Sequence, residues 1–170
     1  MMFHSQNLEE SWYDTAQICL NGHVITDSSK TTPGLKRQFC DKCGAATITE
    51  CPKCKANIRG HYHVPGIISV GKGFKAPKFC SDCGAAYPWT ESSLKAVHAL
   101  ANEIEQISDD EKNILTHSLD DLVKETPQTE VAAIRVKKIM RKAGTEAAYA
   151  LREILIDIIS ETARRAIFGQ

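Results

Sequence analysis

The sequence predicts an α+β fold in which a small N-terminal domain of short antiparallel strands precedes an all-α C-terminal bundle of about four helices. Three observations predict it. All seven cysteines lie within residues 19–83. Short runs of β-branched residues separate them, as in small strands. Beyond Trp89 the cysteines cease, and apolar residues recur three and four apart, which is the spacing of amphipathic helices. We therefore expect domains at 1–90 and 91–170.

The cysteine spacing in the first domain indicates metal binding. An odd number of cysteines does not suit a disulfide framework, whereas a C-x-x-C pair aims two thiolates at one tetrahedral ion. The three such pairs are Cys40 with Cys43, Cys51 with Cys54, and Cys80 with Cys83. The remaining cysteine, Cys19, precedes His23 in ICLNGH, whose Asn-Gly suits a turn. Eight ligands in four pairs saturate two structural zinc ions, so the domain is predicted to be a double zinc ribbon.

The assignment of pairs to ions is less constrained, because sequential, nested and interleaved arrangements all use the same eight residues. An internal repeat favours the sequential one: FCDKCGAA and FCSDCGAA both have the form of a second ligand pair. Site one would then use Cys19, His23, Cys40 and Cys43, and site two would use Cys51, Cys54, Cys80 and Cys83. In the nested alternative, the short segment 44–50 closes one ribbon on the two middle pairs.

Further elements of both domains follow from local patterns. Residues 24–25, 47–49 and 67–70 are β-branched runs that predict strands. Predicted helices run from Thr90 or Ser92 to about 107, from a Ser108–Glu111 capping box to Pro127, over 130–143, and from a Thr145 cap to about 168. The last helix is apolar almost all round, which is typical of a central helix or of an oligomer interface. We therefore expect a homo-oligomer, most simply a dimer.

Charge limits the choice of partners. The chain has 21 basic and 21 acidic side chains, which argues against a surface built throughout to hold nucleic acid or anionic lipid. A local basic face remains on the predicted helix 130–143, where Arg135, Lys138 and Lys142 are candidate nucleic-acid contacts. Such a run is more often a solvated face, or pairs with acids such as Asp120 and Asp121.

The absence of certain sequence features bears on where the protein is located and on whether it is an enzyme. No run approaches the roughly 20 apolar residues of a membrane-spanning helix. The first residues carry acids where a secretory signal carries basic residues, so we expect a cytoplasmic protein without a membrane partner. Every cysteine is used as a ligand, saturated zinc has no open position, and no Gly-rich phosphate loop occurs. We therefore expect no enzymatic activity.

Several segments together resemble an uncharacterised bacterial family. They are ICLNGH, FCDKCGAATITECPKC, FCSDCGAAYPWTE and the stretch SDDEKNILTHSLDDLVKETPQTEVAA. The resemblance implies a bacterial source and a zinc-ribbon module joined to a helical domain, and it brings neither a reaction nor a named partner. We expect a zinc-binding adaptor or scaffold protein with an unknown protein partner. The alternative is a nucleic-acid-binding regulator that uses the ribbons and the basic helix.

Overall fold

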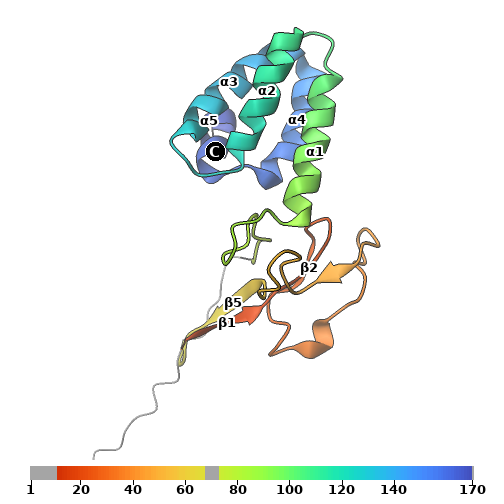
Figure 1. Cartoon of the computed structure of the whole chain (residues 1–170), viewed down its shortest axis with the longest axis vertical. Helices are drawn as coiled ribbons and strands as arrows, with labels where there is room; N and C mark the ends of the chain where they lie inside the picture. The colour runs from red at the N-terminus through yellow and green to blue at the C-terminus, as the bar shows by residue number, and fades with distance from the viewer. Residues whose placement is uncertain (1–10, 68–72, 170) are drawn as a thin grey trace, which may run out of the picture. The chain divides into compact units, whose positions relative to one another are not determined.

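The computed structural model describes residues 11–67 and 73–169. The chain divides between Pro88 and Trp89 into two compact units, which are described separately below (Figure 1). No helix among the described residues is long and apolar enough to span a bilayer. Of the expected strand at 67–70, residues 68–70 lie outside the described part of the chain.

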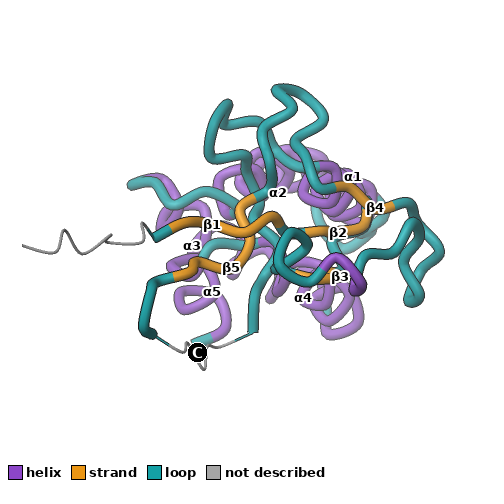
Figure 2. The backbone as a smooth tube through the Cα atoms, turned by 90° about the horizontal axis from the view of Figure 1, so that it is seen from below, coloured by secondary structure: helices purple, strands orange, loops and turns teal. Residues whose placement is uncertain are grey.

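The N-terminal unit contains two small antiparallel sheets. In one, β1 (Trp12–Thr15) pairs with β5 (Arg59–His63), and the two strands lie side by side in Figure 2. In the other, the strand order is β3 (Val24–Thr26), β2 (Gln17–Cys19), β4 (Thr47–Ile48). The expected strands at 24–25 and 47–49 are confirmed as β3 and β4. A short 3₁₀ helix, η1 (Pro33–Leu35), follows β3.

Few apolar side chains are buried in this unit. Among its described residues, those buried apart from cysteine are Ala16, Ile18, Ile58 and Tyr87. Four cysteines are also buried, namely Cys19, Cys40, Cys51 and Cys80. Such a core is too small to offset the conformational entropy of the ordered backbone. The unit therefore depends on interactions other than apolar burial.

One of these interactions is made by the buried carboxylate of Asp14 on β1. Its Oδ1 accepts hydrogen bonds from the amides of Thr15 (2.6 Å) and Lys30 (2.9 Å), and its Oδ2 accepts from the Thr31 hydroxyl (2.7 Å) and amide (3.2 Å). His63 Nε2 on β5 lies 3.5 Å from Oδ2. Burial opposes ionisation, but these hydrogen bonds outweigh it and lower the pKa of Asp14 to about 2. The carboxylate thereby fixes the segment after β3 to β1.

A second interaction is the close approach of two backbone segments at Gly60 in β5. The amide of His61 donates a hydrogen bond to the Asp27 carbonyl at 2.8 Å, and the amide of Ala16 donates to the Ile58 carbonyl at 2.8 Å. A Cβ atom on Gly60 would lie 2.0 Å from the Asp27 oxygen. Only glycine therefore permits both contacts.

The C-terminal unit contains five α-helices among the described residues, where the sequence predicted about four. They are α1 (Pro88–Asn102), α2 (Asp109–Leu122), α3 (Gln128–Ala143), α4 (Thr145–Ile158) and α5 (Glu161–Phe168). The predicted capping box of α2 is confirmed, with Ser108 and Glu111 each bonding the other's amide. The predicted cap at Thr145 is wrong, because Gly144 with φ 86° precedes α4 and no side-chain cap forms.

The additional helix arises because the predicted helix 145–168 is interrupted at Ser160. Ile159 adopts an extended conformation, and the Ser160 hydroxyl accepts a hydrogen bond from the Ala163 amide at 3.2 Å, which begins α5. The Ser160 amide donates to the Leu122 carbonyl at 2.7 Å. The cap therefore also binds the last residue of α2, and this contact could not be inferred from helical periodicity.

Helix α3 is central to this unit, because it packs against α2, α4 and α5. Its buried face includes Ala133, Val136 and Ile139. On α4, Leu151, Leu155 and Ile158 are also buried within the unit. Of the two roles considered for the apolar C-terminal helix, the structure supports a place in the bundle core.

The close approach at Gly60 predicts a strong effect of one added methyl group. Gly60→Ala should destabilise the N-terminal unit by about 3 kcal/mol, because the backbone atoms that meet the new Cβ must shift. Calorimetry of the zinc-loaded chain should show the melting temperature of this unit falling by more than about 10 °C. Gly34→Ala is the matched control, since a Cβ there meets nothing within 4 Å. Equal melting temperatures for the two variants would contradict the described contact.

The low pKa of Asp14 predicts a stabilising role for its charge. A carboxylate whose pKa falls on folding stabilises the folded state above its unfolded pKa of about 4, and loses that effect as pH falls towards 2. At pH 7, Asp14→Asn should therefore cost about 2 kcal/mol. Amide hydrogen exchange in β1 and β5 should accelerate roughly 30-fold. The exposed Glu50, changed to Gln, should leave these rates unchanged.

Candidate functional site

Three segments of the N-terminal unit have the same local structure around a C-x-x-C pair. In the first, the Cys40 amide donates to the Ala45 carbonyl at 2.9 Å, and the Gly44 amide donates to the Cys40 carbonyl at 2.8 Å. The segments that begin at 51 and 80 repeat both bonds, at 2.8 and 2.9 Å. The sequence repeat revealed two of these knuckles. The third, CPKCKA, is also one of the predicted ligand pairs, but it lies outside the repeat because lysine stands where the other two have glycine.

That lysine, Lys55, has φ 64°, and it is the only non-glycine residue with positive φ in the described part of the chain. Gly44 and Gly84 occupy the same position in the other knuckles with φ 69° and 71°. A left-handed conformation is unfavourable for a residue with a Cβ atom. The knuckle geometry is therefore imposed on Lys55 by its surroundings and not by its own preference.

The fourth ligand pair lies in the turn between β2 and β3. Cys19 ends β2, the predicted Asn-Gly turn follows, and the Cys19 amide donates to the His23 carbonyl at 3.0 Å. Gly22 has φ 87°, which a turn of this kind requires. The Asn21 side-chain amide donates to Cys43 Sγ at 3.4 Å. This contact was not predicted, and it makes Asn21 a positioning residue for a thiolate from another segment.

The structure brings the eight predicted ligands together in two groups of four. One group contains Cys19, His23, Cys40 and Cys43, and the other contains Cys51, Cys54, Cys80 and Cys83; within each, the ligand atoms all lie within 4.8 Å of one another. This is the sequential pairing. The nested alternative is wrong, because Cys40 and Cys51 belong to different groups.

The distances of the first group fit a tetrahedral zinc ion. With Zn–S bonds of about 2.3 Å and Zn–N bonds of about 2.0 Å, two sulfurs lie about 3.8 Å apart and a sulfur and a nitrogen about 3.5 Å apart. Cys19 Sγ lies 3.8 Å from Cys43 Sγ. His23 Nδ1 lies 3.5 Å from both Cys19 Sγ and Cys40 Sγ. These three separations match the edges of the expected tetrahedron.

The second group fits the same ion with four sulfur ligands. Cys51 Sγ lies 3.8 Å from Cys83 Sγ, and Cys54 Sγ lies 3.6 Å from Cys80 Sγ. All of these cysteines are free thiols and not disulfides. The Ala56 amide lowers the pKa of Cys54, but burial and the neighbouring thiols outweigh it and raise this pKa to about 12. Such neighbouring thiolates repel one another, and a divalent cation relieves the repulsion.

Backbone amides favour the thiolate form at one position in each group. The Ala45 amide lowers the pKa of Cys43 to about 6. The amides of Asp82 and Cys83 likewise lower the pKa of Cys80 to about 6. The thiolate is the form that binds zinc, so these amides prepare both groups for the metal. The two groups are therefore compatible with two structural zinc ions.

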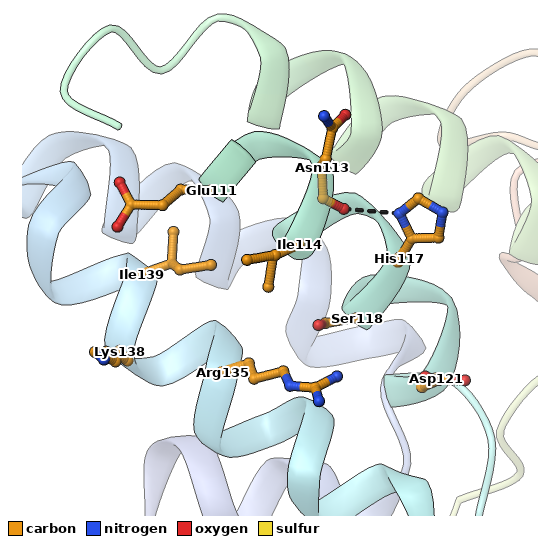
Figure 3. A pocket seen from close by; sticks show the side chains of 9 residues that line it. All are labelled: Glu111, Asn113, Ile114, His117, Ser118, Asp121, Arg135, Lys138 and Ile139. Atoms are coloured by element: carbon orange, nitrogen blue, oxygen red, sulfur yellow. Dashed lines mark hydrogen bonds between the residues drawn. The ribbon is translucent and has the colours of Figure 1, made fainter. Parts of the chain in front are cut away.

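The basic residues of α3 lie in a different chemical setting. Lys142 forms an ion pair with Glu111 of α2, with Nζ 2.5 Å from the carboxylate. Arg135 and Lys138 are exposed and line a groove between α2 and α3 in which Asp121 also lies (Figure 3). The three candidate nucleic-acid contacts thus do not form a uniformly basic surface.

Two histidines on β5 face acidic residues. His61 Nδ1 lies 4.0 Å from a carboxylate oxygen of Asp27, and His63 approaches Asp14 as described above. The His63 ring also stacks on Trp12, with 4.4 Å between ring centroids. In the described part of the chain, the groups that could hold a metal ion include neither histidine.

Comparison with known proteins gives one match. The sequence model of a family described as "Uncharacterized protein conserved in bacteria (DUF2321)" matches residues 12–167. No curated protein and no solved structure matches the chain significantly. The matched residues include parts of both units.

The strained position in the middle knuckle predicts opposite effects of two substitutions. Lys55→Gly should stabilise the zinc-loaded unit by up to about 1 kcal/mol, since glycine accepts positive φ. Gly84→Ala should cost about 1 kcal/mol for the same reason, and a Cβ there meets nothing within 4 Å. Calorimetric melting temperatures measure both changes.

The control is Lys53→Gly, the same chemical change two residues earlier, where φ is not positive. This variant should be destabilised, because glycine gains freedom in the unfolded chain. Equal shifts for the Lys53 and Lys55 variants would show that Lys55 is not strained.

Proposed function

The chain belongs to the uncharacterised bacterial family DUF2321, and from this starting point we propose that it is a zinc-stabilised adaptor or scaffold protein of the bacterial cytoplasm. In this proposal the two zinc ions hold the N-terminal unit, and the helical unit provides a surface for protein partners. The protein has no catalytic activity of its own.

The main support for a structural role of the metal is that the two groups use all eight predicted ligands. Each group supplies four ligand atoms, which is the full coordination of structural zinc, whereas catalytic zinc keeps a position for water or substrate. All seven cysteines are free thiols, which is typical of proteins in a reducing compartment. These features support a structural role for the metal and a cytoplasmic location.

Nucleic-acid binding is the second candidate and has less support. Binding to a phosphate backbone requires several cations on one surface. Lys142 is paired with Glu111, and Asp121 lies in the same groove as Arg135 and Lys138. A phosphate chain in this groove would meet an acid as well as cations. The helical unit is therefore better suited to a protein partner with charges of both signs.

Metal content tests the structural role. Native mass spectrometry of the untagged chain, purified without chelator, should show two zinc ions per chain. Cys83→Ser should lose one ion and the fold of its site, because four-ligand coordination contributes folding free energy directly. Helical circular dichroism from the second unit should persist. Ser81→Ala, in the same knuckle, is the matched control and should retain both ions.

Cobalt substitution tests whether the sites are closed. Co²⁺ in place of zinc should give the intense visible absorption of tetrahedral thiolate coordination at both sites. Fewer than two bound ions, or a spectrum of five- or six-coordinate cobalt with bound water, would contradict the proposed structural role and reopen a catalytic one.

A further inference from the structure

A groove of about 520 Å³ runs between α2 and α3 of the helical unit. Figure 3 shows Ile114 of α2 and Ile139 of α3 in its middle, with Arg135 and Lys138 along the α3 side. Asp121 lies at the α2 side of one end. The groove thus has an apolar floor and walls of opposite charge.

The opposite charge extends over both helices. Asp109–Leu122 contains five acidic residues and one lysine, so α2 has a net charge of −4. Gln128–Ala143 contains five basic residues and one glutamate, so α3 has a net charge of +4. No ion pair within 4.0 Å involves Asp121, Arg135 or Lys138 among the residues that the structure describes. These three charges are therefore available to a partner.

The same two helices expose large apolar side chains. Ile114 is 46% exposed on α2, and Val131 and Ile134 are 42% and 68% exposed on α3. Exposed apolar residues grouped beside charged ones are typical of protein interfaces. The only other large hydrophobic residue exposed in the described helical unit is Tyr149 of α4. The apolar exposure of this unit is thus concentrated on α2 and α3.

We propose that the α2–α3 face binds the same face of a second copy of this chain. A two-fold axis along the groove places α2 of one copy on α3 of the other, so that each acidic helix meets a basic one. The two helices that meet across the axis also carry the exposed Ile114, Val131 and Ile134. The face is therefore complementary to itself in charge and in apolar character.

Charge complementarity favours a second copy of the chain as the partner of this face. A uniformly acidic partner would be repelled by α2, and a uniformly basic one by α3. The inference rests on the proposed interaction role of the helical unit and identifies its partner as another copy. It is separable from the zinc sites, because metal content and helicity are measured independently of mass.

The experiment uses the full zinc-loaded chain in light scattering coupled to size exclusion. The wild type should have twice the chain mass of 18.8 kDa. Ile134→Asp should give a monomer with unchanged zinc content and circular dichroism. Tyr149→Asp is the matched control, since Tyr149 is 63% exposed outside the face, and this variant should remain a dimer.

Two charge variants test the two-fold arrangement itself. Arg135→Glu with Lys138→Glu makes the charges on the groove walls acidic, and Asn113→Lys with Asp121→Lys makes them basic. Each double variant alone should be monomeric, because like charges then meet across the axis. An equimolar mixture should form a 1:1 heterodimer, since the acidic variant's helices then meet basic ones.

Three results would overturn the proposal. The first is a monomeric wild type at about 100 μM, a concentration at which even micromolar dimers form. The second is a dimer that persists in the Ile134→Asp variant, or a mixture of charge variants that stays monomeric. The third is a monomer that inorganic phosphate stabilises against heat only when Arg135 and Lys138 are present, which would assign the groove to a small anion. A monomer with two bound zinc ions would leave the structural role of the metal intact.

Discussion

Tetrahedral coordination at the two four-ligand groups is the constraint on which the N-terminal unit depends. Its strands are two to five residues long, and few of its apolar side chains are buried. Strands this short do not form independently stable sheets. The ligands, however, come from knuckles and turns distributed along the chain, so each ion fixes segments that the strands alone could not hold together. The Asp14 carboxylate and the close approach at Gly60 then fix the segment that follows β3 against β1 and β5.

The metal groups were predictable because coordination is a local and countable requirement. The spacing within each pair, together with the total of eight ligands, indicated two ions, and the FCxxCGAA repeat favoured the pairing that the structure adopts. Contacts that depend on tertiary neighbours were not predictable. Cys51 and Cys54 were predicted as a ligand pair from their spacing, but the positive φ of Lys55 beside them, which its surroundings maintain, could not be read from the sequence. Strand β1 was missed because it carries mixed side chains and pairs with β5 across a long separation in the sequence.

The helical unit follows different physical rules. Most of its core could be inferred from periodicity and the Ser108 capping box from the SDDE pattern, whereas the cap expected at Thr145 does not form. The extra break at Ser160 was missed because the serine cap lies within a run that is apolar on nearly every side, and because its amide binds the end of α2. The separation of acidic residues onto α2 and basic residues onto α3 is visible in the sequence. That the two helices lie side by side, and so form one face with two signs, is a fact of the fold.

The sequential pairing of ligands also bears on how the protein is made. Every ligand of the first site, up to Cys43, leaves the ribosome before the first ligand of the second site, Cys51. The first site can therefore bind its ion while the rest of the chain is still being synthesised. Its thiolates are then already coordinated when the later cysteines emerge from the ribosome. In a nested arrangement, the site that contains Cys19 could not be completed until Cys83 had been synthesised. Synthesis from the N-terminus thus limits the binding of a zinc ion by thiols that belong to different sites.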